Sequence, residues 1–339
     1  MAMRGRPARS SAALGVIVVA LGVGGSPADP DISVPDGFAV DELIDGLNQP
    51  TQIVIDGDDV LIAQLNGGED DGTGQVLRVS LEDPTQREVL FDDLLKPTGL
   101  ALLDDELWVM EERTLSRGPV AGGELEPVLA DLPYNGRSEG TLTVSPEGQL
   151  LYNTSGTISG LGAAPGSATL WALTPGEDAT PLATGFKNAY GRTFGSDGAL
   201  WQAEMSDGGY DGEPAPDELV LVEPGDDFAW PLCIGDQQPV AFYGGTTEFC
   251  ATTPRSHALF EPGATPTSVA EAPWDDTVLL VALWVERRVV AVPKAGEEQP
   301  VAYTDFVTGI ERPQFLLADG DRLLVVDHEA GRILAVTAP

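Results

Sequence analysis

Residues 185–231 read GFKNAYGRTFGSDGALWQAEMSDGGYDGEPAPDELVLVEPGDDFAWP and hold several strand-like segments around an acidic loop. The run RTF at 192–194 enters the turn signal SDG and continues as ALWQ at 199–202, which is the pattern of a β-hairpin. The run DELVLV at 217–222 supplies a further strand. A recurrence of this unit along the chain predicts a repeat fold.

Five other stretches show the same order of a small or proline-containing turn, an apolar strand, an acidic turn and a second apolar strand. The six read NQPTQIVIDGDDVLIAQ from Asn48, LKPTGLALLDDELWVME from Leu95, GRSEGTLTVSPEGQLLYN from Gly136, KNAYGRTFGSDGALWQAE from Lys187, ATPTSVAEAPWDDTVLLVAL from Ala264 and ERPQFLLADGDRLLVVD from Glu311. Further strands follow most hairpins, as in GQVLRV from Gly74 and REVLF from Arg87. Four strands per repeat of this length are typical of a β-propeller blade.

The sequence therefore predicts an all-β, six-bladed β-propeller of four-stranded antiparallel blades. Equivalent turn positions fall at Pro50, Pro97, Ser138, Ala189, Pro266 and Pro313, at intervals of 47, 41, 51, 77 and 47 residues. An insertion around 232–262 accounts for the long interval. The last repeat ends without a fourth strand, and FAVDELI from Phe38 is a strand without a blade. We expect it to complete the sixth blade and so to close the ring.

The N-terminus has the pattern of a secretory signal. Three arginines within residues 1–10 precede an uncharged run at 12–25 and small residues at 26–28. This predicts a cleaved signal peptide at 1–28, with an uncleaved anchor as the alternative, followed by a single propeller domain at 29–339. Two cysteines, Cys233 and Cys250, favour one disulfide in a secreted or periplasmic protein.

The charge balance restricts the partners of this chain. It has 18 Lys and Arg against 54 Asp and Glu, a net charge of −36. Nucleic acid and anionic membrane surfaces are therefore poor partners. The propeller geometry nevertheless directs scarce basic side chains to one face, which indicates an anionic ligand; these are Lys96, Arg137, Lys187, Arg287 and Arg312. The alternative is that they pair with neighbouring acids such as Glu111, Glu139 and Glu311.

Two further features at that face allow a functional and a structural interpretation. His328 is a candidate general base, or a surface histidine beside Asp327 and Glu329. The loop at 206–218 places five carboxylates among glycines and prolines, which suits calcium but lacks the EF-hand spacing. The alternative is a solvated acidic loop.

Residues 187–250 resemble the glucose/sorbosone dehydrogenase family, in GFKNAYGRTFGSDGALWQAE, in PDELVLVEPGDDFAWPLCIGD and in the second cysteine. The resemblance extends more weakly to VPDGFAV from Val34, KPTGLAL from Lys96 and IERPQFLLADGDRLLVVDHEAGRI from Ile310. Members of this family are secreted six-bladed propellers that use pyrroloquinoline quinone and calcium. The resemblance implies oxidation of a sugar or related polyol.

The resemblance also implies site residues. Lys187 and Asn188 stand where the family holds the quinone, and Arg312 stands where it meets a cofactor carboxylate. The family's calcium side falls on Glu204, Ser206 and Asp207. Arg137 and Arg287, which come from the basic side chains directed to the same face and not from the resemblance, complete the expected cofactor-binding set. The family's blade-three turn carries a histidine that takes the substrate proton, but here residues 134–144 read YNGRSEGTLTV.

Arg137 cannot replace that histidine, because an arginine side chain stays protonated at neutral pH. Glu139 and His328 are the remaining candidates for a base. Two alternatives to a quinoprotein follow. One is a catalytically degenerate propeller that binds an anionic or carbohydrate ligand without turnover. The other is a metal-dependent lactonase propeller, with Asn135, Asn188, Glu204 and Asp327 around an axial metal.

Overall fold

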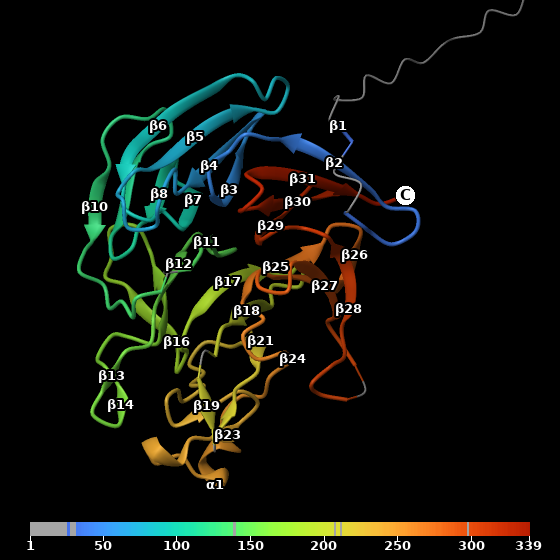
Figure 1. The fold of residues 1–339 in the computed structure, drawn as a ribbon. Coiled ribbons are helices and arrows are strands. Elements are labelled where there is room, and N and C mark those ends of the chain that lie inside the picture. The colour runs from blue at the N-terminus through green and yellow to red at the C-terminus, as the bar shows by residue number, and fades with distance from the viewer. Residues whose placement is uncertain (1–25, 28–31, 138–139, 207, 211, 297) are drawn as a thin grey trace, which may run out of the picture.

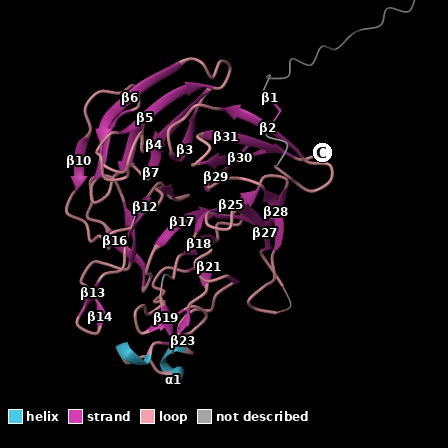
Figure 2. Ribbon diagram, in the orientation of Figure 1, coloured by secondary structure: helices cyan, strands magenta, loops and turns pink. Residues whose placement is uncertain are grey.

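The computed structural model describes residues 26–27, 32–137, 140–206, 208–210, 212–296 and 298–339. Over these ranges six antiparallel sheets of four or more strands follow one another round a central axis (Figure 1). Helix within them is confined to the short segments Ala241–Tyr243 and Thr247–Cys250, the latter labelled α1 (Figure 2). The predicted all-β, six-bladed propeller is confirmed.

Each blade begins with its innermost strand and adds later strands outwards. Blades one to three are β3 Pro50–Asp56, β4 Asp59–Gln64, β5 Gly74–Ser80 and β6 Arg87–Leu94; β7 Gly99–Leu103, β8 Glu106–Met110, β9 Leu115–Pro119 and β10 Glu126–Leu129; and β11 Thr143–Val144, β12 Leu150–Thr154, β15 Thr169–Leu173 and β16 Thr180–Thr184. Blades four to six are β17 Ala189–Phe194, β18 Leu200–Glu204, β21 Asp217–Val222 and β24 Ala258–Phe260; β25 Pro266–Ala272, β26 Asp275–Leu283, β27 Arg288–Pro293 and β28 Thr304–Thr308; and β29 Pro313–Asp319, β30 Arg322–Asp327, β31 Arg332–Thr337 and β2 Ala39–Ile44.

The hydrophobic core lies between neighbouring blades. Ile53 of blade one packs with Val326 of blade six, and Leu151 of blade three packs with Val220 of blade four. Because neighbouring sheets cover each other's faces, the strand interiors are committed to packing. The turns at the two ends of the ring are left to meet a ligand.

The ring is closed by β2, as the sequence predicts. β2 pairs antiparallel with β31, with Val40 opposite Val336, and so supplies the outermost full strand of blade six. Ile44 at its end is 1% exposed and packs in the core between blades six and one. Two strands from opposite ends of the chain thus share one sheet, so blade six holds both together.

The segment after blade four's third strand leaves the sheet and returns. It contains the hairpin of β22 Cys233–Ile234 and β23 Gln238–Pro239, the two short helices, and a disulfide between Cys233 and Cys250. The predicted disulfide is therefore present. β24, within the range expected for the insertion, is the outermost strand of blade four, so the excursion lies between β21 and β24.

The predicted signal peptide lies almost entirely outside the described residues. Within it, β1 Ser26–Pro27 pairs with β2 at the edge of blade six. No helix in the described part of the chain is long and apolar enough to cross a membrane. Two more hairpins, β13 Ile158–Ser159 with β14 Gly162–Ala163 and β19 Gly209–Tyr210 with β20 Glu213–Pro214, follow the second strands of blades three and four.

Candidate functional site

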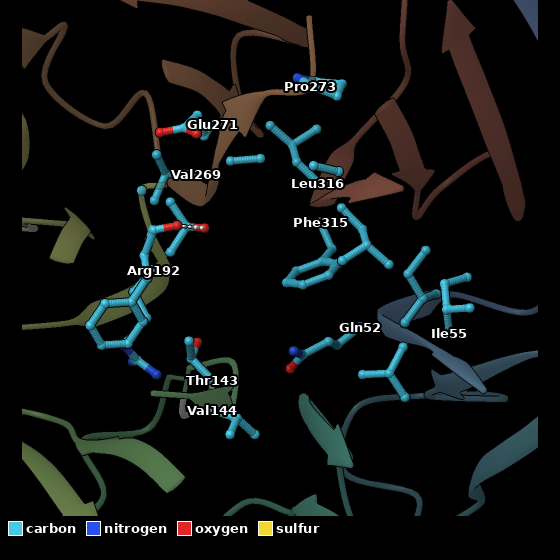
Figure 3. Close-up of a pocket in the computed structure, with 18 of the residues that line it drawn as sticks. Gln52, Ile55, Thr143, Val144, Arg192, Val269, Glu271, Pro273, Phe315 and Leu316 are labelled. Atoms are coloured by element: carbon cyan, nitrogen blue, oxygen red, sulfur yellow. Dashed lines mark hydrogen bonds between the residues drawn. The ribbon is translucent and has the colours of Figure 1, made fainter. Parts of the chain in front are cut away.

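The ring has a hollow at each end. In every blade the first strand starts, and the second ends, at the same face, which we call the entry face. Here a pocket of about 280 Å³ is lined by residues from all six blades or the turns before them; they include Thr51, Thr98, Arg137, Asn188, Tyr190, Thr267, Trp284, Gln314 and His328. A larger hollow of about 940 Å³ opens at the opposite face (Figure 3).

The larger hollow has polar groups that are already paired. Gln52 lies on its wall (Figure 3). Its side chain donates to the carbonyl of Leu142 at 2.8 Å and accepts the amide of Leu100 at 2.8 Å. Glu271 accepts the amide of Ser196 at 3.0 Å. Among the described residues, no buried polar side-chain atom without a partner belongs to this hollow. Its groups join the blades, so it is not the better candidate site despite its size.

The entry-face pocket has unpaired hydrogen-bond donors in its wall. The hydroxyl of Thr98 and the indole nitrogen of Trp284 are buried and have no partner among the residues that the structure describes. Buried polar atoms are normally hydrogen-bonded, so an unpaired donor on a residue that lines a pocket favours a ligand with acceptor atoms. This contrast selects the smaller pocket.

A ring of side chains surrounds this pocket, one position after each proline-containing turn. The hydroxyl of Thr51 donates to the carbonyl of Pro97 at 2.7 Å, and that of Thr267 donates to the carbonyl of Pro313 at 2.9 Å. The amide of Gln314 in blade six donates to the hydroxyl of Tyr190 in blade four at 2.6 Å. These bonds connect different blades and therefore fix the shape of the pocket.

Side chains that end the second strands hold the entry turns in place. Glu204 accepts the amides of Lys187 at 2.5 Å and Asn188 at 3.1 Å through one oxygen. The same arrangement recurs in four other blades, where the acceptors are Gln64, Glu111, Asn153 and Asp327. An acid at this position in the sequence thus does not by itself indicate a metal ligand.

Glu204 also belongs to a buried group of acids. Its second oxygen has no partner among the described residues, and Glu204 lines a cavity of about 20 Å³ together with Ser206 and Glu218. Burial, followed by the charge of Glu218, raises its pKa well above the usual value, against the opposing amides of Asn188 and Lys187. A carboxyl in this environment favours the protonated form or a nearby cation.

Glu218 is held by two serine hydroxyls. Ser206 donates to one oxygen at 3.2 Å and Ser256 donates to the other. Burial raises the pKa of Glu218 to about 7, helped by Asp236 and Asp217 and opposed by the two hydroxyls. No cluster of three or more His, Cys, Asp or Glu side chains arranged for a metal occurs in the described residues. The predicted calcium ligand Asp207 lies outside them.

The predicted quinone-side pair separates in the structure. Asn188 is 3% exposed, lines the pocket, accepts from the amide of Asn135 at 2.8 Å and donates to the carbonyl of Met205 at 3.1 Å. Lys187 instead places its ammonium 5.9 Å from the ring centre of Trp230, beside the disulfide-containing segment. Asn188 is therefore the member of the pair that borders the pocket.

The five basic residues predicted to converge have different surroundings. Lys96 is buried and pairs with Glu69 at 2.6 Å; burial works to lower its pKa, but Glu69 and Tyr134 outweigh this and raise it. Arg137 lines the pocket with an exposed side chain. Arg312 stacks on Trp284, with 4.4 Å from the guanidinium carbon to the ring centre. Arg287 is exposed on the turn that follows Trp284.

His328 is part of the pocket wall and is 8% exposed. Its Nδ1 lies 2.9 Å from the carbonyl oxygen of Pro50 in blade one. Burial lowers its pKa, against the opposing effects of Pro50 and of the acids Glu329, Glu69 and Asp327. The interpretation of His328 as a surface turn residue is therefore wrong. The other candidate base, Glu139, lies outside the described residues.

The sequence interpretation missed most of the pocket ring. Thr51, Thr98, Thr267 and Gln314 were not among the residues expected at this face, although each follows one of the equivalent turn positions; Tyr190 was expected there. The recurring Pro-Thr dipeptide at 50–51, 97–98 and 266–267 is the signal that could have identified them. The arrangement presents hydroxyl and amide groups to a ligand about the axis of the ring.

Comparison with known proteins supports the same architecture. No family model and no curated protein sequence matches the chain. Solved structures do match. The holo form of the pyranose dehydrogenase PQQ domain from Coprinopsis cinerea has a TM-score of 0.75 at 16% identity, covering 93% of this chain and 98% of that one.

Two other structures illustrate the range of similarity. The calcium structure of the carbohydrate-active enzyme of family AA12 from Trichoderma reesei has a TM-score of 0.75 at 17% identity, covering 93% and 98% of the two chains. The PQQ-bound aldose sugar dehydrogenase from Streptomyces coelicolor has a TM-score of 0.68 at 18% identity, covering 91% and 100%. The chain thus has the six-bladed propeller fold of the pyrroloquinoline-quinone-dependent sugar dehydrogenases.

Proposed function

We propose that the entry-face pocket binds a planar, anionic quinone of the pyrroloquinoline type, and that the protein is an oxidoreductase acting on a sugar or related polyol. The observation that carries the proposal is the pair of unpaired buried donors, Thr98 and Trp284, in a pocket bordered by Arg137 and by the Arg312–Trp284 stack. The lining also contains two acids, and both have partners: Glu69 pairs with Lys96, and Asp217 accepts the amides of Ser206 and Thr265.

The donor set fits such a cofactor. The indole and hydroxyl donors suit carbonyl or carboxylate oxygens, and the guanidinium groups of Arg137 and Arg312 suit carboxylates. Asn188 would contribute its pocket-lining amide, while Lys187 and Arg287 supply more distant positive charge. When bound, the quinone would supply the acceptor for a hydride, which carries the two electrons of the oxidation. The pocket side chains bind and orient the reactants.

The buried acids of blade four offer oxygen ligands for calcium. Glu204 offers one carboxylate oxygen without a described partner, next to Ser206 and Glu218. Oxygen ligands of this type suit calcium. With Asp207, these residues form the candidate calcium side of the site. Calcium binding would also relieve the charge repulsion between Glu204 and Glu218.

We also propose that the protein is exported from the cytoplasm. The disulfide between Cys233 and Cys250 is characteristic of proteins outside the cytoplasm. It accords with the signal pattern of residues 1–28. We place the protein in the periplasm or the extracellular medium, where a sugar or polyol would reach the pocket directly.

A titration of the purified protein with pyrroloquinoline quinone, with and without calcium, tests the proposal. Fluorescence of Trp284 in the pocket wall should change on binding, and dye reduction should follow with a member of a sugar and polyol panel. Arg312→Ala should weaken binding at least tenfold. Arg322→Ala is the matched control, because Arg322 pairs with Asp319 at the opposite end of the same hairpin.

Failure to bind the quinone at micromolar concentration would sink the proposal. A second function, ligand binding without turnover, is favoured by the blade-three turn, which has no histidine between Tyr134 and Thr141. It predicts that an anionic or carbohydrate ligand binds in an Arg312-dependent manner while no dye is reduced with any substrate. Turnover in the wild type decides between the two functions.

A further inference from the structure

The tautomer of His328 is fixed by its surroundings. The Nδ1 atom lies 2.9 Å from the carbonyl oxygen of Pro50. A carbonyl oxygen can only accept a hydrogen bond, so Nδ1 must carry the hydrogen. In a neutral imidazole the other nitrogen, Nε2, then has a lone pair. Since Pro50 opens the first strand of blade one, the hydrogen bond also fixes the ring across the boundary between blades six and one.

The surroundings of His328 have two opposite effects on its protonation. Burial favours the neutral ring, and nearby acids favour the protonated ring. Burial disfavours the charged form, and so lowers the pKa of His328. Three acids act in the opposite direction: Glu69 from blade one, and Asp327 and Glu329 beside the histidine. Of the basic groups nearby, Lys96 is paired with Glu69 and Arg332 is paired with Asp327. The neutral ring can thus accept a proton at Nε2, and the three acids offset part of the cost of burying the resulting charge.

We propose that Nε2 of His328 is the proton acceptor for a ligand hydroxyl in the entry-face pocket, in blade six instead of blade three. This inference rests on the proposed function. In the step, the hydroxyl O–H bond breaks and an N–H bond forms at Nε2. The carbon-bound hydrogen leaves with two electrons to a quinone oxidant, and the alcohol carbon becomes a carbonyl. The imidazolium proton then passes to solvent.

The second histidine provides an internal control. Nε2 of His257 lies 2.8 Å from the carbonyl oxygen of Pro293, so His257 holds the opposite tautomer, with hydrogen on Nε2. The ring packs edge-to-face on Trp201 and lies outside the entry-face pocket. The chain contains only these two histidines, so one substitution assigns both spectra.

Nitrogen-15 NMR of histidine-labelled protein tests the geometry without any cofactor. At neutral pH, His328 should give the signals of an Nδ1–H tautomer and His257 those of an Nε2–H tautomer, with His257→Gln providing the assignment. An Nε2–H tautomer at His328 overturns the proposal, whether or not the protein is an enzyme. This measurement uses wild-type protein and therefore does not depend on a variant that folds.

Kinetics of the quinone-loaded protein test the role. In His328→Asn, kcat measured at saturating quinone should fall at least 100-fold, as is usual for loss of a general base. The acidic limb of the wild-type pH profile should disappear from the residual rate. Wild-type kcat and an unchanged profile in the variant overturn the proposal. Absence of quinone binding by the wild type instead overturns the proposed function, which separates the two failures.

Discussion

The carboxylate of Glu204 lies 3.1 Å from the backbone nitrogen of Asn188, and the same oxygen accepts the neighbouring amide of Lys187. The end of one strand in blade four thereby fixes the turn that precedes its partner strand. That turn delivers the Asn188 side chain to the entry-face pocket. The acid closest to the predicted cofactor pair is thus a structural acceptor through one oxygen, and only its other oxygen is open to a cation.

Replacing Glu204 with alanine should lower the free energy of unfolding by about 2–4 kcal/mol, because two buried amides lose their acceptor. Glu204→Gln keeps an acceptor oxygen and resembles the protonated carboxyl, so it should cost less than about 1 kcal/mol. Urea titrations of both variants measure the difference. Equal losses in the two variants would show that the acceptor oxygen is not what holds the turn.

Stability should decrease as the pH rises through the range in which Glu218 ionises. Its pKa is raised from 4.5 to about 7 in the folded protein, so the folded state holds the proton more tightly than the unfolded state does. Between about pH 4.5 and pH 7 the folded state binds more protons, and the free energy of unfolding falls with increasing pH. The difference corresponds to about 3 kcal/mol.

The measurement compares wild type with Glu218→Gln by urea denaturation at pH 5 and pH 8, in EDTA to exclude divalent cations. The variant should lose this part of the pH dependence, together with the part of the raised Glu204 pKa that the charge of Glu218 causes. Parallel pH profiles for the two proteins would contradict the assignment. Addition of calcium should stabilise the wild type more at pH 8 than at pH 5, because the carboxylate is then the ligand.

Removing the disulfide should destabilise the protein by about 3 kcal/mol. Cys233 and Cys250 are separated by 17 residues, and closing a loop of this size restricts the unfolded chain by about that amount. The double serine variant and the reduced wild type should show the same loss in urea titrations. An unchanged stability in the double variant would mean that the loop is equally ordered without the bond.

Substitutions in β2, the strand that closes the ring, should change stability according to the burial of the residue replaced. Ile44→Ala should cost about 2–5 kcal/mol, because Ile44 is 1% exposed in the core shared by blades six and one. Asp41→Asn, on the same strand but exposed, is the matched control and should change stability by less than about 0.5 kcal/mol. Thermal unfolding followed by circular dichroism compares them. Similar midpoints for the two variants would argue against closure by this strand.

The blades were predictable because their turns repeat. Pro50, Pro97, Pro266 and Pro313 mark four of them, and the hairpin pattern identifies the other two even though the first strand of blade three, Thr143–Val144, is short. Closure was predictable because FAVDELI had no other sheet to join. These features depend on local periodicity, which the sequence displays directly.

The site was less predictable because its contacts join distant blades. The sequence does not indicate that Glu69 forms a salt bridge with Lys96, or that Gln314 forms a hydrogen bond with Tyr190 across the ring. Nor does it show that the carboxylate of Asp327 accepts hydrogen bonds from the backbone amides of Glu311 and Arg312. Long-range packing determines which of the polar residues at a propeller mouth remain open to a ligand.

The pairing of β2 with β31 also governs how the protein is made. Residues 39–44 are synthesised early, and their partner strand at 332–337 is synthesised almost 300 residues later. Blade six can form only when both are present. Blades one to five can assemble during synthesis, but the ring closes only after translation has passed the last strand. A chain that lacks residues 332–337 therefore leaves β2 without its partner, and an unpaired strand edge is prone to pair with other chains.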